Sequence, residues 1–104
     1  MRTPHLLLAF ILLDEASAPH RGLKELDSRI GVTITRKIDK RAVVRNRLRR
    51  RIKETFRLER GNFVAPVEMV VVALNGANEL EFKDLRGEFL SLLRKAKILP
   101  NKQW

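Results

Sequence analysis

IGVTITRKIDKRAVVRNRLRR, residues 30–50, changes its hydrophobic period in the middle. From Arg29 to Thr35, Ile and Val alternate with Gly and Thr, which is the period-two pattern of a strand with one buried face. From Arg41 to Leu58, apolar residues recur at every fourth position, which predicts an amphipathic helix. Gly61 is expected to end this helix as a left-handed cap residue. The buried stripe of the helix is predicted to consist of Val44, Leu48, Ile52 and Phe56.

The N-terminal part of the chain contains an apolar run that allows two interpretations. His5–Leu13 is predicted to be a strand with both faces largely buried. The alternative is a secretory signal, because Ala16-Ser17-Ala18 resembles a cleavage site. Two acidic residues separate that site from the apolar run, and the run is short for a signal and far too short to span a membrane. The strand is favoured, and Asp14–Ser28 is predicted to be a loop with a short helical turn near Leu23–Leu26.

The C-terminal half adds one strand and one helix. Val67–Leu74 is almost wholly apolar, which is typical of a central strand, and Asn75-Gly76 is a turn sequence. Glu81–Lys97 is predicted to be a second amphipathic helix that ends before Pro100. The core side of this helix is expected to hold Phe82, Leu85, Phe89, Leu92, Leu93 and Ala96.

The order of these elements is strand, strand, helix, strand, helix. This order predicts an α+β fold or an α/β sandwich in which helices pack on a small mixed β-sheet. At 104 residues the chain is expected to be a single domain, residues 1–104, with a disordered tail at 99–104. A right-handed connection is the default for a strand–helix–strand unit that joins parallel strands.

The positive charge of the chain is concentrated in one segment. Residues 36–60 contain 12 basic and three acidic side chains, a net charge of +9 against +10 for the whole chain. Arginine outnumbers lysine there by nine to three, and guanidinium groups suit phosphates and base edges. A helix built for solubility would intersperse acids to gain pairs four residues apart. The segment therefore predicts a nucleic acid as the partner.

Helical geometry places these cations on one side. At 100° per residue, the side opposite the apolar stripe holds Asn46, Arg50, Lys53 and Arg57, with Arg47 and Arg49 at its flanks. Arg45 and Arg51 fall nearer the core boundary, where long stems can lie over apolar side chains. The helix is therefore expected to present at least five cations and one amide.

Other classes of site find little support in the sequence. The absence of Cys excludes disulfides and thiolate metal sites, and His5 and His20 lack a partner at metal-ligand spacing. No glycine-rich phosphate loop is present. The acids are scattered, which argues against a protein-only nuclease that would hold metal ions with clustered carboxylates.

Ile30-Gly31-Val32-Thr33-Ile34-Thr35-Arg36-Lys37, together with residues 40–50, resembles the signature of the bacterial ribonuclease P protein family. The hallmark of that family is a strand of this type, two basic residues, and a helix that contains A-V-x-R-N-R, here Ala42–Arg47. The apolar strand at 68–73 and the closing helix also fit the family order. The resemblance covers roughly residues 3–98.

The resemblance implies a fold like ribosomal protein S5 domain 2, with a left-handed strand–helix–strand connection in place of the default. It implies the RNA-binding subunit of ribonuclease P, whose catalytic RNA removes the 5′ leader from precursor tRNA with Mg²⁺ bound mainly by the RNA. The protein would supply no catalytic side chain, and we expect a cytoplasmic monomer in a 1:1 complex with the RNA. The RNA-binding residues expected on this basis are Arg36, Lys37, Lys40, Arg41, Arg45, Asn46, Arg47, Arg49, Arg50, Lys53 and Arg57.

The resemblance also implies a cleft between helix and sheet that holds the single-stranded leader. Phe10 is the candidate for stacking on a leader base, because it is the only aromatic residue in the first strand. Core packing is the other role open to Phe10, since Leu6, Leu8 and Leu12 share its face. Family members usually begin with a basic segment and a helix, whereas this chain starts almost directly at the strand. If those residues are absent from the protein, the cleft is expected to lose one wall.

Two other binding functions compete with this interpretation. The first is a ribosome-associated structural protein that uses the basic helix on ribosomal RNA, and the R-N-R spacing argues against it. The second is a DNA-binding regulator with the helix in a major groove. The sequence shows no dimerisation element, and the helix is flanked by strands, so this function is disfavoured.

Overall fold

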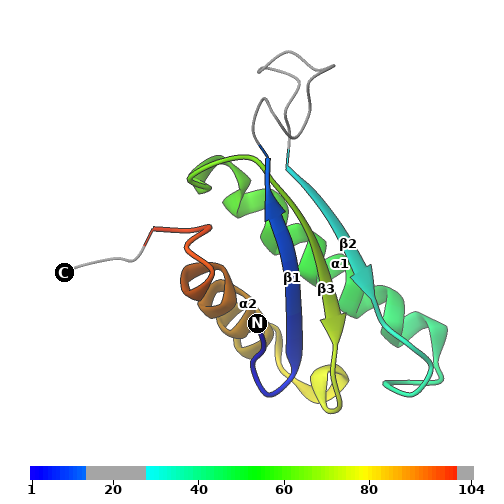
Figure 1. Cartoon of the computed structure of the whole chain (residues 1–104). Coiled ribbons are helices and arrows are strands. Elements are labelled where there is room, and N and C mark those ends of the chain that lie inside the picture. Colours follow the sequence, from blue (N-terminus) through cyan, green and yellow to red (C-terminus); the bar gives the residue numbers. More distant parts are fainter. Residues whose placement is uncertain (14–27, 101–104) are drawn as a thin grey trace.

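A computed structural model describes residues 1–13 and 28–100 of the chain (Figure 1). The elements confirm the predicted order of strands and helices. The loop after the first strand, its predicted helical turn, the sequence at 16–18 and His20 lie outside the described residues. The elements are β1 (Leu6–Leu12), β2 (Arg29–Thr33), α1 (Ala42–Glu59), η2 (Arg60–Asn62), β3 (Val67–Ala73), η3 (Ala77–Glu79) and α2 (Phe82–Lys95), where η2 and η3 are short 3-10 helices.

β3 is the central strand of a three-stranded mixed sheet, as its apolar sequence predicted. It pairs antiparallel with β1 and parallel with β2, in the order β1-β3-β2. In the middle of the sheet Met69 lies between Phe10 on β1 and Ile30 on β2. This register aligns the apolar positions of the three strands on one face.

Both helices pack on that face, and the core lies between them and the sheet. The predicted stripe of α1 is confirmed for Leu48, Ile52 and Phe56, whereas Val44 is only half-buried. The prediction did not include Thr55, which is also buried and whose hydroxyl donates to the carbonyl of Arg51 at 3.1 Å. The sheet contributes Leu6, Leu8, Val67, Met69, Val71 and Ala73 to the core, and α2 contributes Leu85, Phe89, Leu92 and Leu93.

The opposite face of the sheet is open. Ala9 and Ile11 on β1 and Val70 on β3 are exposed there, Ile11 at 59%. The prediction that both faces of the first strand are largely buried is therefore wrong. None of the helices in residues 1–13 and 28–100 packs on this face, and a short apolar run cannot by itself show how many faces of its strand are covered.

The connection from β2 through α1 to β3 is left-handed, as the resemblance implies. In Figure 1 both strands run downward, α1 passes behind the sheet, and β3 lies to the left of β2. Viewed from the helix side with the strands pointing up, the second strand is on the left, opposite to the default for such units.

The sequence predictions are confirmed at the turn after β3 but not at the ends of α1 and α2. Gly76 has a φ of 88°, which confirms the Asn75-Gly76 turn. Gly61 lies inside η2 and is not left-handed, so its predicted role as a left-handed cap is wrong. After α2, Lys97 has a φ of 61°, and the chain turns so that Leu99 is buried. The expected disordered tail therefore does not include Leu99, and residues 101–104 lie outside the described part of the chain.

Within the described residues, no helix has the length and apolar character needed to cross a bilayer.

Candidate nucleic-acid interface

The side of α1 that faces away from the sheet is exposed and basic. Asn46, Arg47, Arg50 and Lys53 are all exposed, and Arg49 is half-buried at the flank, as the helical geometry predicted. Their positions follow from the buried stripe on the other side, because burial of that stripe fixes the rotation of the helix about its axis. The sequence pattern and the core together therefore turn these cations outward.

A shallow hollow of about 440 Å³ lies on this side of α1. Its walls come from successive turns of one helix, so the backbone sets the spacing of the side chains. Five of the six lining residues are predicted RNA contacts, and Glu54 is the addition. The lining consists of Asn46, Arg49, Arg50, Lys53, Glu54 and Arg57.

Four of these side chains are already paired with one another on the helix. Arg57 contacts the carboxylate of Glu54 through Nη2 at 2.6 Å and Nε at 3.0 Å. These hydrogen bonds lower the pKa of Glu54 and raise the pKa of Arg57. Arg49 donates from Nη1 to Oδ1 of Asn46 at 3.1 Å, so the amide N–H groups of Asn46 are its remaining donors.

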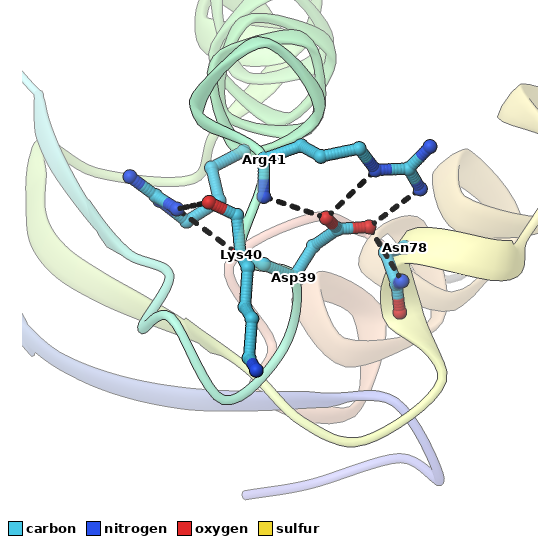
Figure 2. Close-up of polar contacts among 5 residues, drawn as sticks. Asp39, Lys40, Arg41 and Asn78 are labelled. Atoms are coloured by element: carbon cyan, nitrogen blue, oxygen red, sulfur yellow. Dashed lines mark hydrogen bonds and ion pairs between the residues drawn. The ribbon is translucent and has the colours of Figure 1, made fainter.

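The start of α1 is organised by one carboxylate, shown in Figure 2. Asp39 accepts from the backbone N–H of Arg41 at 2.9 Å and from its guanidinium at 3.1 and 3.0 Å. The amide of Asn78, on η3, donates to the same carboxylate at 3.1 Å. The side chain of Asp39 is only 7% exposed, and the hydrogen bonds from Arg41 hold its pKa well below the usual range. Asp39 thus ties the segment before α1 to the segment before α2.

The sequence predictions missed this carboxylate. A local signal for it exists, because Asp accepting from the N–H two residues later is a common turn motif ahead of a helix. The contact to Asn78 joins residues 39 positions apart, and only the fold brings them together.

The basic side chains at the edges of α1 and in the preceding loop differ in the contacts they make within the protein. Arg45 donates from Nη1 to the carbonyls of Asp39 and Lys40 at 3.0 and 2.9 Å. Arg51 is half-buried, with its guanidinium 5.5 Å from the ring centre of Phe82. Both positions agree with the predicted core boundary. The predicted contacts in the preceding loop, Arg36, Lys37 and Lys40, are exposed.

A second hollow, of about 530 Å³, lies across the three strands of the sheet. Phe10 borders this hollow, but it is half-buried and packs against the core cluster, which was the other role open to it. The exposed side chains on the open face near it are Ala9, Ile11 and Val70, with Arg29 and Glu68 at one end. Sequence reasoning missed this surface because it assumed that the strand was covered on both faces.

The described residues contain no group of three or more His, Asp or Glu side chains that could hold a metal ion. What residues 28–60 provide is a rigid array of hydrogen-bond donors with positive charge. Arrays of this kind suit phosphates and ribose hydroxyls.

Comparisons with known proteins agree with this geometry. The chain is 38% identical over 72 residues to a ribonuclease P protein component of Clostridium botulinum, and the match covers 68% of this chain and 64% of the relative. A ribonuclease P protein component of Idiomarina loihiensis is 45% identical over 67 residues, covering 64% and 53%. The chain therefore spans less than two thirds of the length of these relatives.

Solved structures show the same fold. The RNase P protein of Staphylococcus aureus superposes with a TM-score of 0.75 at 19% identity, covering 95% of this chain and 81% of that one. The RNase P protein of Thermotoga maritima, solved with a fluorophenyl thiourea, gives a TM-score of 0.72 at 25% identity, covering 91% and 82%. The family pattern for ribonuclease P matches residues 2–97. On its sequence and its fold, this chain belongs to the ribonuclease P protein family.

Proposed function

We propose that this chain is the protein subunit of ribonuclease P and that it binds a catalytic RNA which removes the 5′ leader from precursor tRNA. The observation that carries the proposal is the middle of α1. Arg47, Arg50 and Lys53 are exposed and make no ion pair within the described residues, next to an amide at Asn46. Repulsion between unpaired cations at fixed spacing lowers the stability of the free protein, and an anionic partner relieves that repulsion.

The open face of the sheet is the proposed path of the leader. Its hollow is apolar along Ala9, Ile11 and Val70, and Arg29 lies at one end. Single-stranded RNA binds surfaces that combine apolar contact for the bases with a cation for the backbone. Phe10 contributes to the floor of this surface from the core side. Its ring is therefore a weaker candidate for contact with a leader base than the exposed side chains are.

In this proposal the metal ions belong to the RNA. Phosphodiester hydrolysis needs a metal-activated water or a positioned general base. The cations of α1 would act by offsetting the repulsion between the phosphates of the catalytic RNA and those of its substrate. The protein should therefore lower the Mg²⁺ concentration at which the RNA cleaves.

The test is cleavage of precursor tRNA by a bacterial RNase P RNA transcript across a Mg²⁺ titration, with and without this protein. The expected result is a midpoint at lower Mg²⁺ with the protein, and no cleavage by the protein alone. An unchanged midpoint would contradict the proposal. Cleavage by the RNA-free protein that is lost on mutating one of its acids would contradict it as well.

The salt dependence of binding gives an independent check. Contacts from about six of these cations to phosphates imply a slope of log affinity against log salt of about −4 to −5. A slope shallower than about −2 would show that the basic side of α1 is not the interface.

A further inference from the structure

An aromatic ring lies exposed at the start of α2, next to the basic helix. Phe82 was expected on the core side of α2, and the structure shows that expectation to be wrong, since the residue is 41% exposed. The chain places it on the surface because α2 begins at Phe82, ahead of the first buried position at Leu85. A single exposed aromatic side chain is common on protein surfaces, so a binding role for Phe82 depends on the groups beside it.

The neighbouring group is Arg51 of α1. Its guanidinium lies 5.5 Å from the ring centre of Phe82, which is the geometry of a cation–π contact. Within the described residues no carboxylate pairs with Arg51, so its N–H donors are available to an acceptor from outside. Arg47 lies one helical turn earlier on the same side of α1 and is exposed.

The charged side chains around Phe82 limit how a partner can lie. At the start of α2, Glu81 and Asp84 are exposed beside Lys83, whose Nζ lies 3.9 Å from Glu81, so this end of α2 attracts a phosphate less than the arginines of α1 do. Arg47 and Arg51 favour a phosphate over α1. A nucleotide at this corner would therefore direct its phosphate toward α1 and its base toward α2.

We propose that Phe82 and Arg51 form a stacking site for one unpaired nucleotide of the bound RNA. The base stacks on the planar surface of this pair, and its phosphate accepts hydrogen bonds from Arg51 and Arg47. Only an unpaired base can present its face to a protein ring, because the bases of a duplex are stacked on one another. The inference deepens the proposed function by naming a contact beside the hollow of α1.

The test separates stacking from charge. Affinities of the wild-type protein, Phe82→Ala, Phe82→Leu, Arg51→Lys and Arg51→Gln are measured for three RNAs across a salt series. The RNAs are an RNase P RNA transcript, a short unstructured oligouridylate, and a blunt RNA duplex of the same length. Val64→Ala is the matched control, since Val64 is 58% exposed and lies beyond the C-terminal end of α1.

The expected result is selective. Phe82→Ala and Phe82→Leu should weaken binding of the transcript and the oligouridylate by roughly five- to hundredfold, with no change in salt slope and none in duplex affinity. Arg51→Gln should weaken binding and reduce the slope by about 0.7–0.9, whereas Arg51→Lys should keep the slope and lose affinity. Val64→Ala should bind all three RNAs as the wild type does.

Several results would overturn the stacking site. The stacking site is contradicted if both Phe82 variants bind the transcript and the oligouridylate with wild-type affinity. It is also contradicted if the Phe82 variants lose as much affinity for the duplex as for the single-stranded RNA. Thermal unfolding of each variant identifies a folding defect, and Phe82→Leu decides if Phe82→Ala does not fold. If the wild-type protein showed no preference for the transcript, the proposed function would fail, while the oligouridylate would still test the stacking site.

Discussion

The start of α1 and its middle carry the same kind of side chain but use it differently. At the start, Arg41 is held by the carboxylate of Asp39, and Arg45 is held by two backbone carbonyls. In the middle, Arg47 and Arg50 are exposed and make no ion pair within the described residues. Of the 12 basic residues in the segment 36–60, several are therefore already engaged within the protein and are not available to a partner. The contacts at the start of α1 order the segment, whereas the arginines in the middle of α1 remain available to an anionic partner.

Charge removal in the middle should have the largest effect. The double variant Arg47→Ala Arg50→Ala is expected to lower affinity for RNase P RNA by between about tenfold and a hundredfold, since each arginine contributes about 1.4 kcal/mol and neighbours three residues apart on a helix need not add in full. Equilibrium binding at fixed salt measures it. Arg86→Ala Lys95→Ala removes the same charge from exposed positions on α2 and is the control. Equal losses of affinity in the two double variants would indicate that RNA is attracted by the overall positive charge. The middle of α1 would then not differ from the rest of the surface.

Asn46→Ala should have an intermediate effect. The amide lies on the exposed side of α1, so its loss should leave the thermal unfolding midpoint nearly unchanged. Loss of one interface hydrogen bond of about 1 kcal/mol corresponds to about fivefold in affinity. Unfolding and binding are measured on the same preparation. A lower unfolding midpoint with unchanged affinity would show that Asn46 is structural.

Arg41→Ala should change RNA affinity by less than about threefold, because its charge is already offset by Asp39. Binding measured beside Arg50→Ala sharpens the comparison, since both variants lose one arginine from the same helix region. A loss at Arg41 as large as that at Arg50 would mean that the RNA displaces Asp39 and uses the start of α1 directly.

The smallest effect is expected in the pH dependence of stability. The folded pKa of Asp39 is depressed, so its stabilising contribution is complete above the ordinary carboxyl pKa of about 3.9 and is lost as pH falls through the folded value. Wild-type protein should therefore lose more stability than Asp39→Asn when both are unfolded by denaturant at decreasing pH below about 4. The Asn side chain can still accept from the N–H of Arg41, which makes it a close control. Parallel pH profiles would show that the Asp39 charge is not coupled to folding.

The buried and exposed sides of α1 could be predicted because they depend on the geometry of one helix. Leu48, Ile52 and Phe56 repeat with the helical period, and their burial turns Asn46 and Arg50 outward. The prediction was wrong at Phe82, which fits the apolar side of α2 by spacing. Periodicity cannot tell where the neighbouring element stops covering a helix, and Phe82 lies at that limit.

The sequence by itself determined the order of strands and helices, the concentration of charge on one helix, and the family, because hydrophobic period and motif spacing are local properties. Tertiary structure alone decided the contact that ties Asp39, at the start of α1, to the segment before α2. Asn78 reaches Asp39 only because η3 follows the central strand to the same end of the molecule as the start of α1. It also decided that no helix of residues 1–13 and 28–100 covers one face of the sheet, since both α-helices pack on the other face. These outcomes depend on contacts between residues far apart in the chain, and no local pattern encodes them.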